Sequence, residues 1–424
     1  NMVDVFNPFS LINALADSDL KNYWAYNKQS DKTACILLSG TGPENGGPGR
    51  EKGGGAVSAL ILLLLAVCLA LLILEDRQVR RDRSELVHVV YVNGIRGKST
   101  VTRMIDGGLR AGGWKVFCKT TGTVPMVIGV DGTARPLVRR GRANISEQVR
   151  VLHRAVREGA QILVIECMAV DPALQAVSQH RMVRADIGVI TNVRLDHTAE
   201  MGPTLEEICD SLSNTIPWNG TLFTADGAFL DQLRTNGRRK NCRVELAQPD
   251  SGLPDFDFPE NVALALAVCR EIGVDRNRAL EGILRYQPDP YALSLFRLPS
   301  GAAFVNAMSV NDPQSTQLDY HRVAGRPGMV GRRLVLLINN RPDRGYRTEH
   351  MMMVARGLEP EEIWLIGASQ RAVRRTLRHI LPDTPVRLFP GAEALPLDSR
   401  GADTMIFAAG NLAGPGKALM ERVR

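Results

Sequence analysis

The chain lacks the cysteine patterns that disulfide-rich and zinc-binding proteins share. Its 424 residues contain seven cysteines, an odd number, and no two of them form a CxxC pair. Scattered cysteines of this kind are typical of reduced thiols in the cytoplasm, and they disfavour both a disulfide framework and a zinc site. These cysteines are Cys35, Cys68, Cys118, Cys167, Cys209, Cys242 and Cys269.

The chain also lacks a long block of basic residues. Its formal net charge of +7 is small for this length, and its arginines are spread along the sequence. Nucleic-acid-binding proteins concentrate positive charge on one face or in one segment, so we expect no nucleic-acid partner. A mildly basic surface suits acidic small molecules or an anionic membrane. The apolar content of 44% and the charged content of 23% are those of a globular protein with room for two or three domains.

The most informative stretch is residues 86–100, LVHVVYVNGIRGKST. An apolar, β-branched run ends at Asn93 and is followed by Gly94-x-x-Gly97-Lys98-Ser99-Thr100. Glycines let a backbone wrap around anionic oxygens, and a helix start offers unpaired N–H groups. A lysine there can neutralise phosphates, and a hydroxyl can bind Mg²⁺. The segment predicts a nucleotide-phosphate site, although Val92 stands where the general Walker pattern has glycine. An ordinary turn between a strand and a helix is the alternative.

One segment has the composition of a membrane span. Residues 56–74 are 19 uncharged residues, long enough to cross the hydrocarbon layer. Four arginines lie in the flank that follows, residues 75–85, whereas Arg50 and Lys52 precede the run. The positive-inside rule then predicts one transmembrane helix with everything after Leu74 in the cytoplasm. A buried core helix is the alternative, and the run is too long for the apolar part of a signal peptide.

The remaining sequence predicts a linear order of segments. Residues 1–55 end in a Gly/Pro-rich stretch and are expected to be a disordered or extraneous extension. Residues 75–85 are expected to form a basic juxtamembrane linker. A helix over 259–286, which PDP at 288–290 ends, places a boundary between one domain at 86–290 and another at 291–424.

Strand-sized apolar runs alternate with helical segments in both domains, which predicts parallel sheets with crossover connections. Further runs lie at 161–165, 187–190, 221–223, 303–305, 334–338, 363–366 and 405–408. Ligands of such sheets bind beyond the carboxyl ends of the strands. The polar residues at those ends are Asn93, Glu166, Asn192, Asn306, Asn339 and Asn411.

Three of these strand ends extend the phosphate-site hypothesis. Glu166 follows a strand and could bind a nucleotide-associated Mg²⁺ through oxygen, although a lone glutamate there is more often a surface or capping residue. Asp196-His197 follows Asn192, and a surface-loop histidine is the alternative for it. The segment 339–344, NNRPDR, is either a solvated turn or a loop that lies over the nucleotide from the second domain.

Eight segments, in this order and spacing, resemble the ligase subunits of capsular poly-γ-glutamate synthases, membrane-bound relatives of the Mur ligases and folylpolyglutamate synthases. They are NGIRGKST, ECMAVDP, TNVRLDHTAEMGPT, FPENVALALA, PDPYAL, VNAMSVNDPQST, NNRPDR and GNLAGPG. The likeness runs from about Ala56 to the C-terminus. Two residues depart from the family pattern. Phe258 stands where a histidine is common, and Tyr291 replaces the glycine of a PDPG turn.

The resemblance implies an α/β protein with a Mur-ligase-like central P-loop ATPase domain, a smaller Rossmann-like C-terminal domain and one preceding transmembrane helix. It implies an ATP- and Mg²⁺-dependent amide ligase that joins glutamate to a poly-γ-glutamate chain through an acyl phosphate. Its implied location is the bacterial cytoplasmic membrane, with cytoplasmic catalytic domains and other membrane subunits as partners. The alternative is a ligase of the same superfamily that acts on a different amino acid or acceptor. A P-loop kinase or GTPase would also fit the loop alone, but no base-reading NKxD follows.

The resemblance also implies roles for single residues. Lys98 would contact the β- and γ-phosphates, Ser99 and Glu166 would bind Mg²⁺, and His197 would bind a second Mg²⁺ near the acyl phosphate. No carbamylated lysine is expected. Further nucleotide contacts are implied for Asn93, Gly94, Gly97, Thr100, Asn192, Asn261, Arg341, Asp343 and Arg344.

Overall fold

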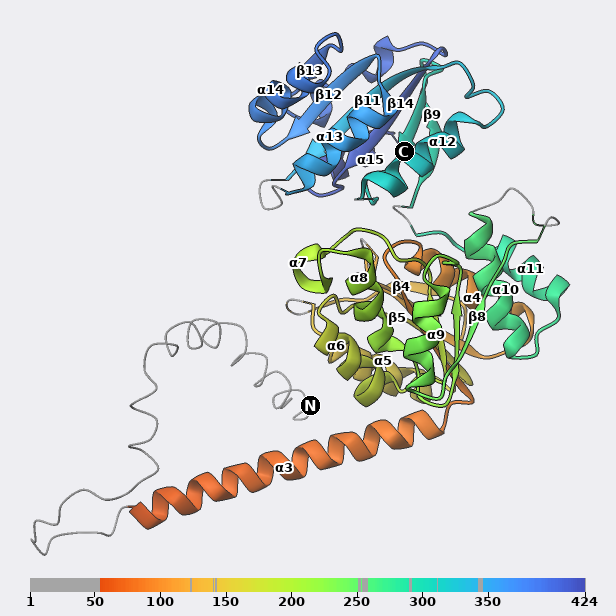
Figure 1. Cartoon of the computed structure of the whole chain (residues 1–424), viewed down its shortest axis with the longest axis vertical. Coiled ribbons are helices and arrows are strands. Elements are labelled where there is room, and N and C mark those ends of the chain that lie inside the picture. The colour runs from red at the N-terminus through yellow and green to blue at the C-terminus, as the bar shows by residue number, and fades with distance from the viewer. Residues whose placement is uncertain are drawn as a thin grey trace, which may run out of the picture.

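Two sheet-containing units follow one another along the chain, and one long helix precedes them (Figure 1). The computed structural model describes residues 54–423 except 123, 140, 142, 251–252, 254–257, 290–291, 311 and 342–345. Residues 1–53 of the extension expected over 1–55 therefore lie outside the described residues, as do Tyr291, Asp343 and Arg344, and residues 54–55 begin a helix.

The first unit contains an eight-stranded sheet. Its strands are β1 (His88–Asn93), β2 (Val116–Thr120), β3 (Met126–Ile128), β4 (Ala134–Pro136), β5 (Ile162–Glu166), β6 (Ile187–Ile190), β7 (Thr221–Thr224) and β8 (Arg243–Leu246). The order is β4-β3-β2-β5-β1-β6-β7-β8, and only β3 and β4 run antiparallel to their neighbours. β1 lies between β5 and β6, so the residues that follow these three strands meet at one edge of the sheet.

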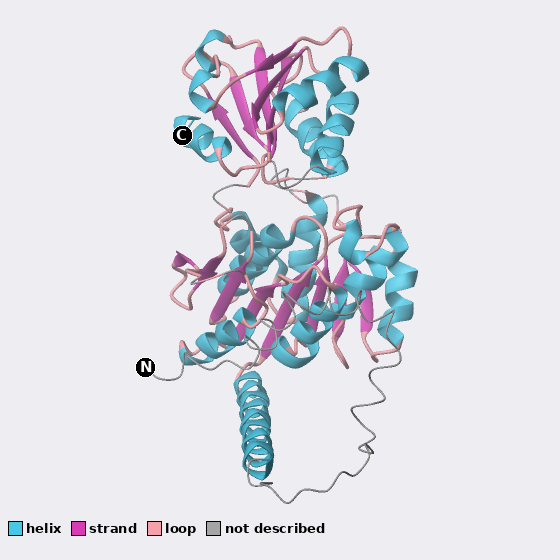
Figure 2. Ribbon diagram, turned by 90° about the vertical axis from the view of Figure 1, so that its left-hand side faces the viewer, coloured by secondary structure: helices cyan, strands magenta, loops and turns pink. Residues whose placement is uncertain are grey.

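Helices cover both faces of this sheet (Figure 2). They are α4 (Lys98–Ala111), α5 (Glu147–Arg157), α6 (Pro172–Val177), α7 (Thr198–Met201), α8 (Leu205–Leu212), α9 (Leu230–Arg238), α10 (Pro259–Glu271) and α11 (Arg276–Leu284), with a π-helical turn η2 (Ser178–Val183) and a 3-10 turn η3 (Ser213–Thr215). Alternate residues of β1 serve the two faces, because successive side chains of a strand point to opposite sides. Val90 packs in one core with α4 and α10, whereas Val89 packs in another with α5.

The helix expected over 259–286 is two helices. α10 ends at Glu271, and Gly273 takes a positive φ of 85° before α11 begins at Arg276. A positive φ is easy for glycine and costly for other residues, so the helix breaks there. Val262 and Cys269 of α10 are fully buried.

The second unit contains a six-stranded sheet in the order β13-β12-β11-β14-β10-β9. Its strands are β9 (Ser294–Arg297), β10 (Ala303–Asn306), β11 (Arg333–Asn340), β12 (Glu362–Gly367), β13 (Val386–Leu388) and β14 (Thr404–Gly410). Only β9 is antiparallel to its neighbour. The helices are α12 (Pro313–Ala324), α13 (Tyr346–Leu358), α14 (Gln370–Ile380) and α15 (Pro415–Val423), with 3-10 turns η4 (Ala392–Ala394) and η5 (Leu397–Ser399).

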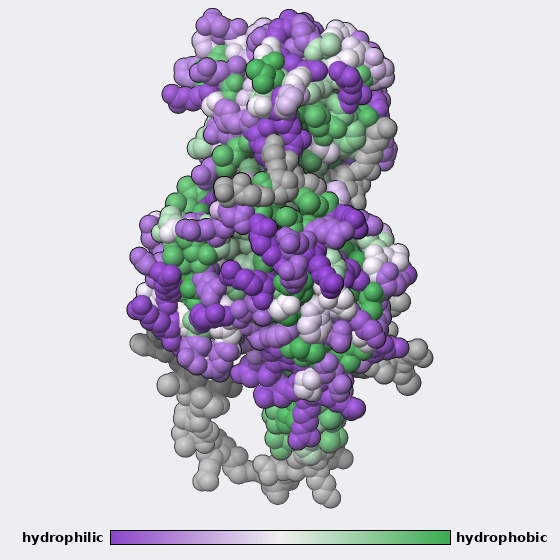
Figure 3. Space-filling view, turned by 90° about the vertical axis from the view of Figure 1, so that its right-hand side faces the viewer, coloured by the Kyte–Doolittle hydropathy of each residue, from purple (hydrophilic) through white to green (hydrophobic). Residues whose placement is uncertain are grey.

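The long helix α3 (Gly54–Ser84) projects away from both units (Figures 1 and 3). Its apolar side chains between Leu60 and Leu74 are exposed, and within the described residues it is the one helix long and apolar enough to cross a membrane. The helix does not end at Leu74 but continues through the basic segment that was expected to be a linker. Val79 and Asp82 are buried there, and Arg184 of the first unit pairs with Asp76 at 2.7 Å. The basic segment is therefore part of a helix packed on the first unit.

Candidate functional site

The loop after β1 has the shape that a phosphate cradle needs. Gly94 and Gly97 adopt positive φ values of 123° and 79°. A Cβ at Gly94 would lie 2.1 Å from Thr191 Oγ1, and one at Gly97 would lie 2.9 Å from Asn261 Oδ1. Both positions therefore require glycine, and the loop passes tightly between the end of β6 and the start of α10. Gly97 directly precedes the first residue of α4, and the free N–H groups of a helix start are suited to bind an anion.

Two asparagines expected to touch the nucleotide make hydrogen bonds within the protein. Asn93 is buried, and its Nδ2 donates to Gln175 Oε1 at 2.9 Å and to Thr215 Oγ1 at 3.2 Å. Asn192 Oδ1 accepts from the Arg96 backbone N–H at 3.0 Å, while its Nδ2 donates to the Arg96 carbonyl at 3.0 Å. Asn192 thus fixes the backbone of the loop from the neighbouring strand end.

Lys98 is the first residue of α4 and is half-buried. Its Nζ donates to the Gly94 carbonyl at 2.7 Å and the Ile95 carbonyl at 3.2 Å, so the ammonium group lies against the loop. Burial lowers the pKa of Lys98, and the negative charge of Glu166 opposes that shift. A phosphate within the loop would be a stronger partner than two neutral carbonyls, because it carries full charge.

Glu166 lies at the end of β5, in register with Val92, and is 2% exposed. Its Oε2 accepts from Ser99 Oγ at 2.7 Å and from the Thr121 backbone N–H at 2.7 Å. Thr121 Oγ1 donates to Oε1 at 2.5 Å. Thr121 was not among the expected site residues. It directly follows β2, which is a strand that the apolar pattern does not indicate.

The groups around Glu166 are suited to a hard divalent cation. Carboxylate and hydroxyl oxygens are ligands that Mg²⁺ and Mn²⁺ accept, and Ser99 brings its hydroxyl to the carboxylate directly. Within the described part of the chain, no three His, Cys, Asp or Glu side chains converge on one point. A cation held by Ser99 and Glu166 would therefore complete its coordination with phosphate oxygens and water, which is how Mg²⁺ accompanies nucleotides.

His197 lies at a separate position after β6. It takes a positive φ of 51°, its backbone N–H donates to Asp196 Oδ1 at 2.8 Å, and its Nε2 is 3.8 Å from Asp196 Oδ2. Burial lowers the pKa of His197, with Asp196 opposing and Lys98 adding to the shift. The lowered pKa favours the neutral imidazole, which is the form that binds metals.

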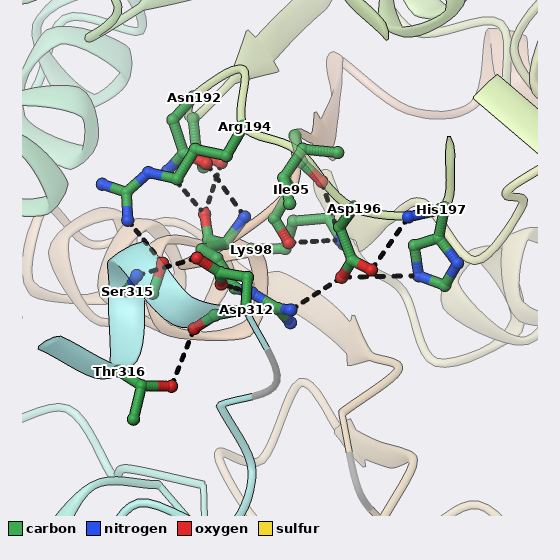
Figure 4. A network of polar contacts seen from close by, with 12 residues as sticks. Ile95, Lys98, Asn192, Arg194, Asp196, His197, Asp312, Ser315 and Thr316 are labelled. Carbon is green, nitrogen blue, oxygen red and sulfur yellow. Dashed lines mark hydrogen bonds and ion pairs between the residues drawn. The ribbon is translucent and has the colours of Figure 1, made fainter. Parts of the chain in front are cut away.

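Arg96, between the two loop glycines, joins this site to the second unit. Figure 4 shows Asp196 and Asp312, the two carboxylates that it contacts. Its Nη2 donates to Asp196 Oδ2 at 2.6 Å and its Nε donates to Asp312 Oδ2 at 2.5 Å. Asp312 is the N-cap of α12, and Arg194 reaches Ser315 of the same helix. Neither Arg96 nor Asp312 was an expected site residue. The signals in the sequence were the arginine inside the loop motif and an Asp-Pro pair that begins a helix.

The other expected contributors lie at the ends of three elements. Thr100 is in the first turn of α4, and Asn261 begins α10 against Gly97. Arg341 directly follows β11 of the second sheet. Phe258, which departs from the family pattern, lies under the Arg322 guanidinium of α12 at 4.7 Å. The aromatic ring therefore makes a cation–π contact between the two units.

A phosphate loop with an adjacent strand-end carboxylate, closed by a second smaller α/β unit, defines an ATP-dependent amide ligase of the Mur ligase type. Residues 92–245 match the family model of the Mur ligase middle domain, and residues 297–424 match that of the poly-gamma-glutamate synthase CapB C-terminal domain. The PGA synthase CapB of Bacillus subtilis (strain 168) is 34% identical over 383 residues, which cover 86% of this chain and 97% of the relative. The chain belongs to the CapB family of poly-γ-glutamate synthases, which confirms the resemblance seen in its motifs.

Solved structures confirm the expected fold. E. coli FolC in complex with ADP is 16% identical and matches with a TM-score of 0.61, covering 85% of this chain and 97% of FolC. A bifunctional folylpolyglutamate synthase/dihydrofolate synthase with Mn, AMPPNP and L-glutamate bound is 15% identical, with a TM-score of 0.61 and coverage of 84% and 98%. The Mur-ligase-like α/β architecture is thus shared over most of both chains.

Proposed function

We propose that this ligase lengthens poly-γ-glutamate for a capsule by activating a glutamate carboxylate as an acyl phosphate. One observation carries the proposal. A phosphate loop with Lys98 and the Ser99–Glu166 pair lies where the second unit contacts the first, through Arg96 and Asp312. Such a junction can hold a nucleotide and two further anionic substrates in line, and positioning supplies much of the catalysis in phosphoryl transfer.

The proposed reaction has two steps. A carboxylate oxygen of the polyglutamate substrate attacks the γ-phosphorus of ATP, so that the bond to ADP breaks and an acyl phosphate forms. The amino nitrogen of the incoming glutamate then attacks the acyl carbon and loses a proton, the C–O bond to phosphate breaks, and an amide bond remains. The first step is required because an oxide is a poor leaving group whereas phosphate is a good one.

The proposed roles of the site residues follow from their charges and donor atoms. Lys98 would move from the loop carbonyls to the β- and γ-phosphates. Ser99 and Glu166 would hold Mg²⁺, and neutral His197 would hold a second Mg²⁺. These ions would supply positive charge to the phosphoryl oxygens. Arg341, together with Asp343 and Arg344 beyond the described residues, would close over the nucleotide from the second unit.

Glutamate as the substrate is supported by two comparisons. The similar Bacillus subtilis protein is named PGA synthase CapB, and the similar folate enzyme was solved with L-glutamate, AMPPNP and Mn. The Mn in that structure supports a divalent cation, for which we propose Mg²⁺. The alternative remains a ligase of the same superfamily with a different amino acid or acceptor.

We also propose that α3 anchors the enzyme in the cytoplasmic membrane, with both units in the cytoplasm and other membrane subunits as partners. Support comes from the exposed apolar side chains between Leu60 and Leu74 and from the arginines that follow them. A contiguous apolar surface of this size would be unusual on a soluble protein.

Hydroxylamine trapping tests the acyl phosphate. Hydroxylamine attacks an acyl phosphate to form a hydroxamate, whereas a kinase product or water-derived phosphate yields none. We expect a hydroxamate only when ATP, Mg²⁺ and a polyglutamate acceptor are all present. Phosphate release without any hydroxamate would contradict the mechanism. The incoming amino acid competes with hydroxylamine for the acyl phosphate, so only the correct amino acid lowers the yield of hydroxamate. Comparing glutamate with aspartate and alanine in the second step therefore distinguishes the alternative ligases.

A further inference from the structure

The Arg96 side chain is shared by two carboxylates that come from different units. Its guanidinium is 20% exposed, whereas the side chains of Asp196 and Asp312 are 4% and 2% exposed. Arg96 and Asp312 are 216 residues apart in sequence. A planar guanidinium has enough donors to serve both carboxylates at once, which the compact ammonium group of lysine does less well.

Each carboxylate that contacts Arg96 also accepts a hydrogen bond from a backbone N–H group. Asp196 accepts the backbone N–H of His197, and Asp312 accepts the backbone N–H of Ser315 at 2.7 Å as the N-cap of α12. Thr316 Oγ1 also donates to the Asp312 carbonyl at 2.7 Å. The contact therefore joins the phosphate loop, the turn that carries His197 and the first turn of α12 (Figure 4).

Hydrogen bonds fix the backbone of Arg96 in this position. Its N–H and carbonyl are both bonded to Asn192, and Thr191 Oγ1 donates to the same carbonyl at 2.5 Å. Without the guanidinium, the buried carboxylates of Asp196 and Asp312 would lose the positive charge that they share. Breaking one side of a buried ion pair is strongly unfavourable, because it leaves uncompensated charge.

We propose that Arg96 is a positioning residue that couples the phosphate loop to the C-terminal unit and holds α12 against the site. Lys98 lies along the loop carbonyls, whereas Arg96 extends to the second unit, so the two adjacent cations have separate tasks. The kinetic tests of this inference rest on the proposed ligase function, whereas the distance measurement does not. Under the proposed function, a second unit held in this place would position the incoming amine beside the activated carboxylate.

Three substitutions separate charge from other effects. Asp312→Asn removes the charge but leaves a residue that caps helices equally well. Arg96→Met removes the guanidinium but keeps an unbranched side chain of comparable reach. Ser315→Ala removes only the hydrogen bond from the Arg194 guanidinium to the Ser315 hydroxyl across the same junction and breaks no ion pair. We expect Asp312→Asn and Arg96→Met to lower kcat by on the order of 10²-fold and to raise the KM for glutamate, because the second unit is misplaced. The KM for ATP should change less than threefold.

The Ser315→Ala variant is expected to lose much less activity than Asp312→Asn. An Arg96→Lys variant should recover part of the lost kcat, because one of the two contacts can re-form. An increase in the KM for ATP alone would overturn the proposal and make Arg96 a phosphate ligand. Equal losses in Ser315→Ala and Asp312→Asn would also overturn it, since the charge would then be irrelevant.

A distance measurement is independent of activity. Spin labels introduced through unnatural amino acids at exposed Arg234 and Arg378 report the separation of α9 from α14 in the full chain in detergent. We expect a narrow distribution in the unsubstituted protein and a broader, longer one in Asp312→Asn and Arg96→Met. An unchanged distribution would overturn the coupling. Should the unsubstituted enzyme fail to use glutamate while the distributions still differ, the proposed function fails and the coupling stands.

Discussion

Lys98 is the single residue on which the phosphate site depends most. We expect Lys98→Ala to lower ATP turnover by roughly 10²–10³-fold, because one charge-assisted contact to the transferring phosphoryl group is lost. The fold should persist, since the Lys98 ammonium contacts only loop carbonyls. Phosphate release with ATP and glutamate measures the effect, and circular dichroism checks the fold.

The matched control is Lys115→Ala. Lys115 is exposed just before β2, at the opposite edge of the same sheet. Both variants lose one positive charge, but only one loses it beside the phosphate loop. Equal turnover in the two variants would remove Lys98 from the site.

A second residue makes the stability of the first unit depend on pH. His180 Nε2 lies 3.3 Å from Lys240 Nζ, and burial, with the Lys240 charge adding to it, lowers the pKa of His180 from 6.5 to about 4. The unfolded chain therefore takes up a proton at a higher pH than the folded protein does. This contribution to stability is complete above pH 6.5 and is lost as the pH falls towards 4.

We therefore expect His180→Gln to flatten the loss of stability between pH 6.5 and 4, whatever it does to stability at pH 7. Urea midpoints of the full chain, measured across this range, provide the test. His379→Gln is the control, because His379 is exposed on α14. An identical pH slope in His180→Gln and the unsubstituted protein would contradict the prediction.

Sequence predicts residue roles well only where the chemistry is local. The residues from Gly94 to Thr100 form one loop and helix start, so their common position follows from the motif. The role of Asn192 as a support for the Arg96 backbone could not be foreseen, because the motif gives a position but no direction for the side chain. Arg96 and Asp312 meet only after both units have folded and docked, which no spacing in the chain encodes.

At the scale of elements, the apolar runs predict the central strands and miss the edges. Strands buried on both faces read as continuous apolar sequence, as at 161–165 and 334–338. The apolar pattern does not indicate β2, although β2 is buried, because the strand contains Lys119. This lysine is fully buried and pairs with Glu147 at 3.0 Å. The edge strand β8 is partly exposed and alternates polar residues.

The helix α3 carries a prediction of its own. Replacing residues 56–74 by a polar linker should release the enzyme from membranes, because most apolar side chains between Leu60 and Leu74 are exposed and available to lipid. Deleting residues 1–50 should leave both attachment and activity unchanged. Pelleting after a carbonate wash measures attachment. A polar-linker variant that still pellets after carbonate would contradict a membrane-spanning α3, and pelleting that high salt abolishes would identify the arginines as a peripheral contact.

At the scale of the whole molecule, the two units have separate hydrophobic cores. The cores that contain Val89, Val90 and Ile190 include no residue of the second sheet, and those that contain Val305 and Phe304 include none of the first. Between the units, the contacts at Arg96, Arg194 and Phe258 are polar or cation–π. Cooperative unfolding follows shared cores, so the units should melt separately.

We therefore expect calorimetry of the full chain in detergent to show two transitions. Phe407 and Phe223 are 0% and 1% exposed in β14 and β7, and replacing a buried phenylalanine by alanine costs about 3–5 kcal/mol. Phe407→Ala should lower one transition and Phe223→Ala the other. AMPPNP with Mg²⁺ should raise the transition that Phe223→Ala lowers, because a ligand stabilises the unit that binds it. A single transition that both variants lower equally would show that docking through Arg96 makes the two units fold as one, and the coupling would then extend from the site to the whole protein.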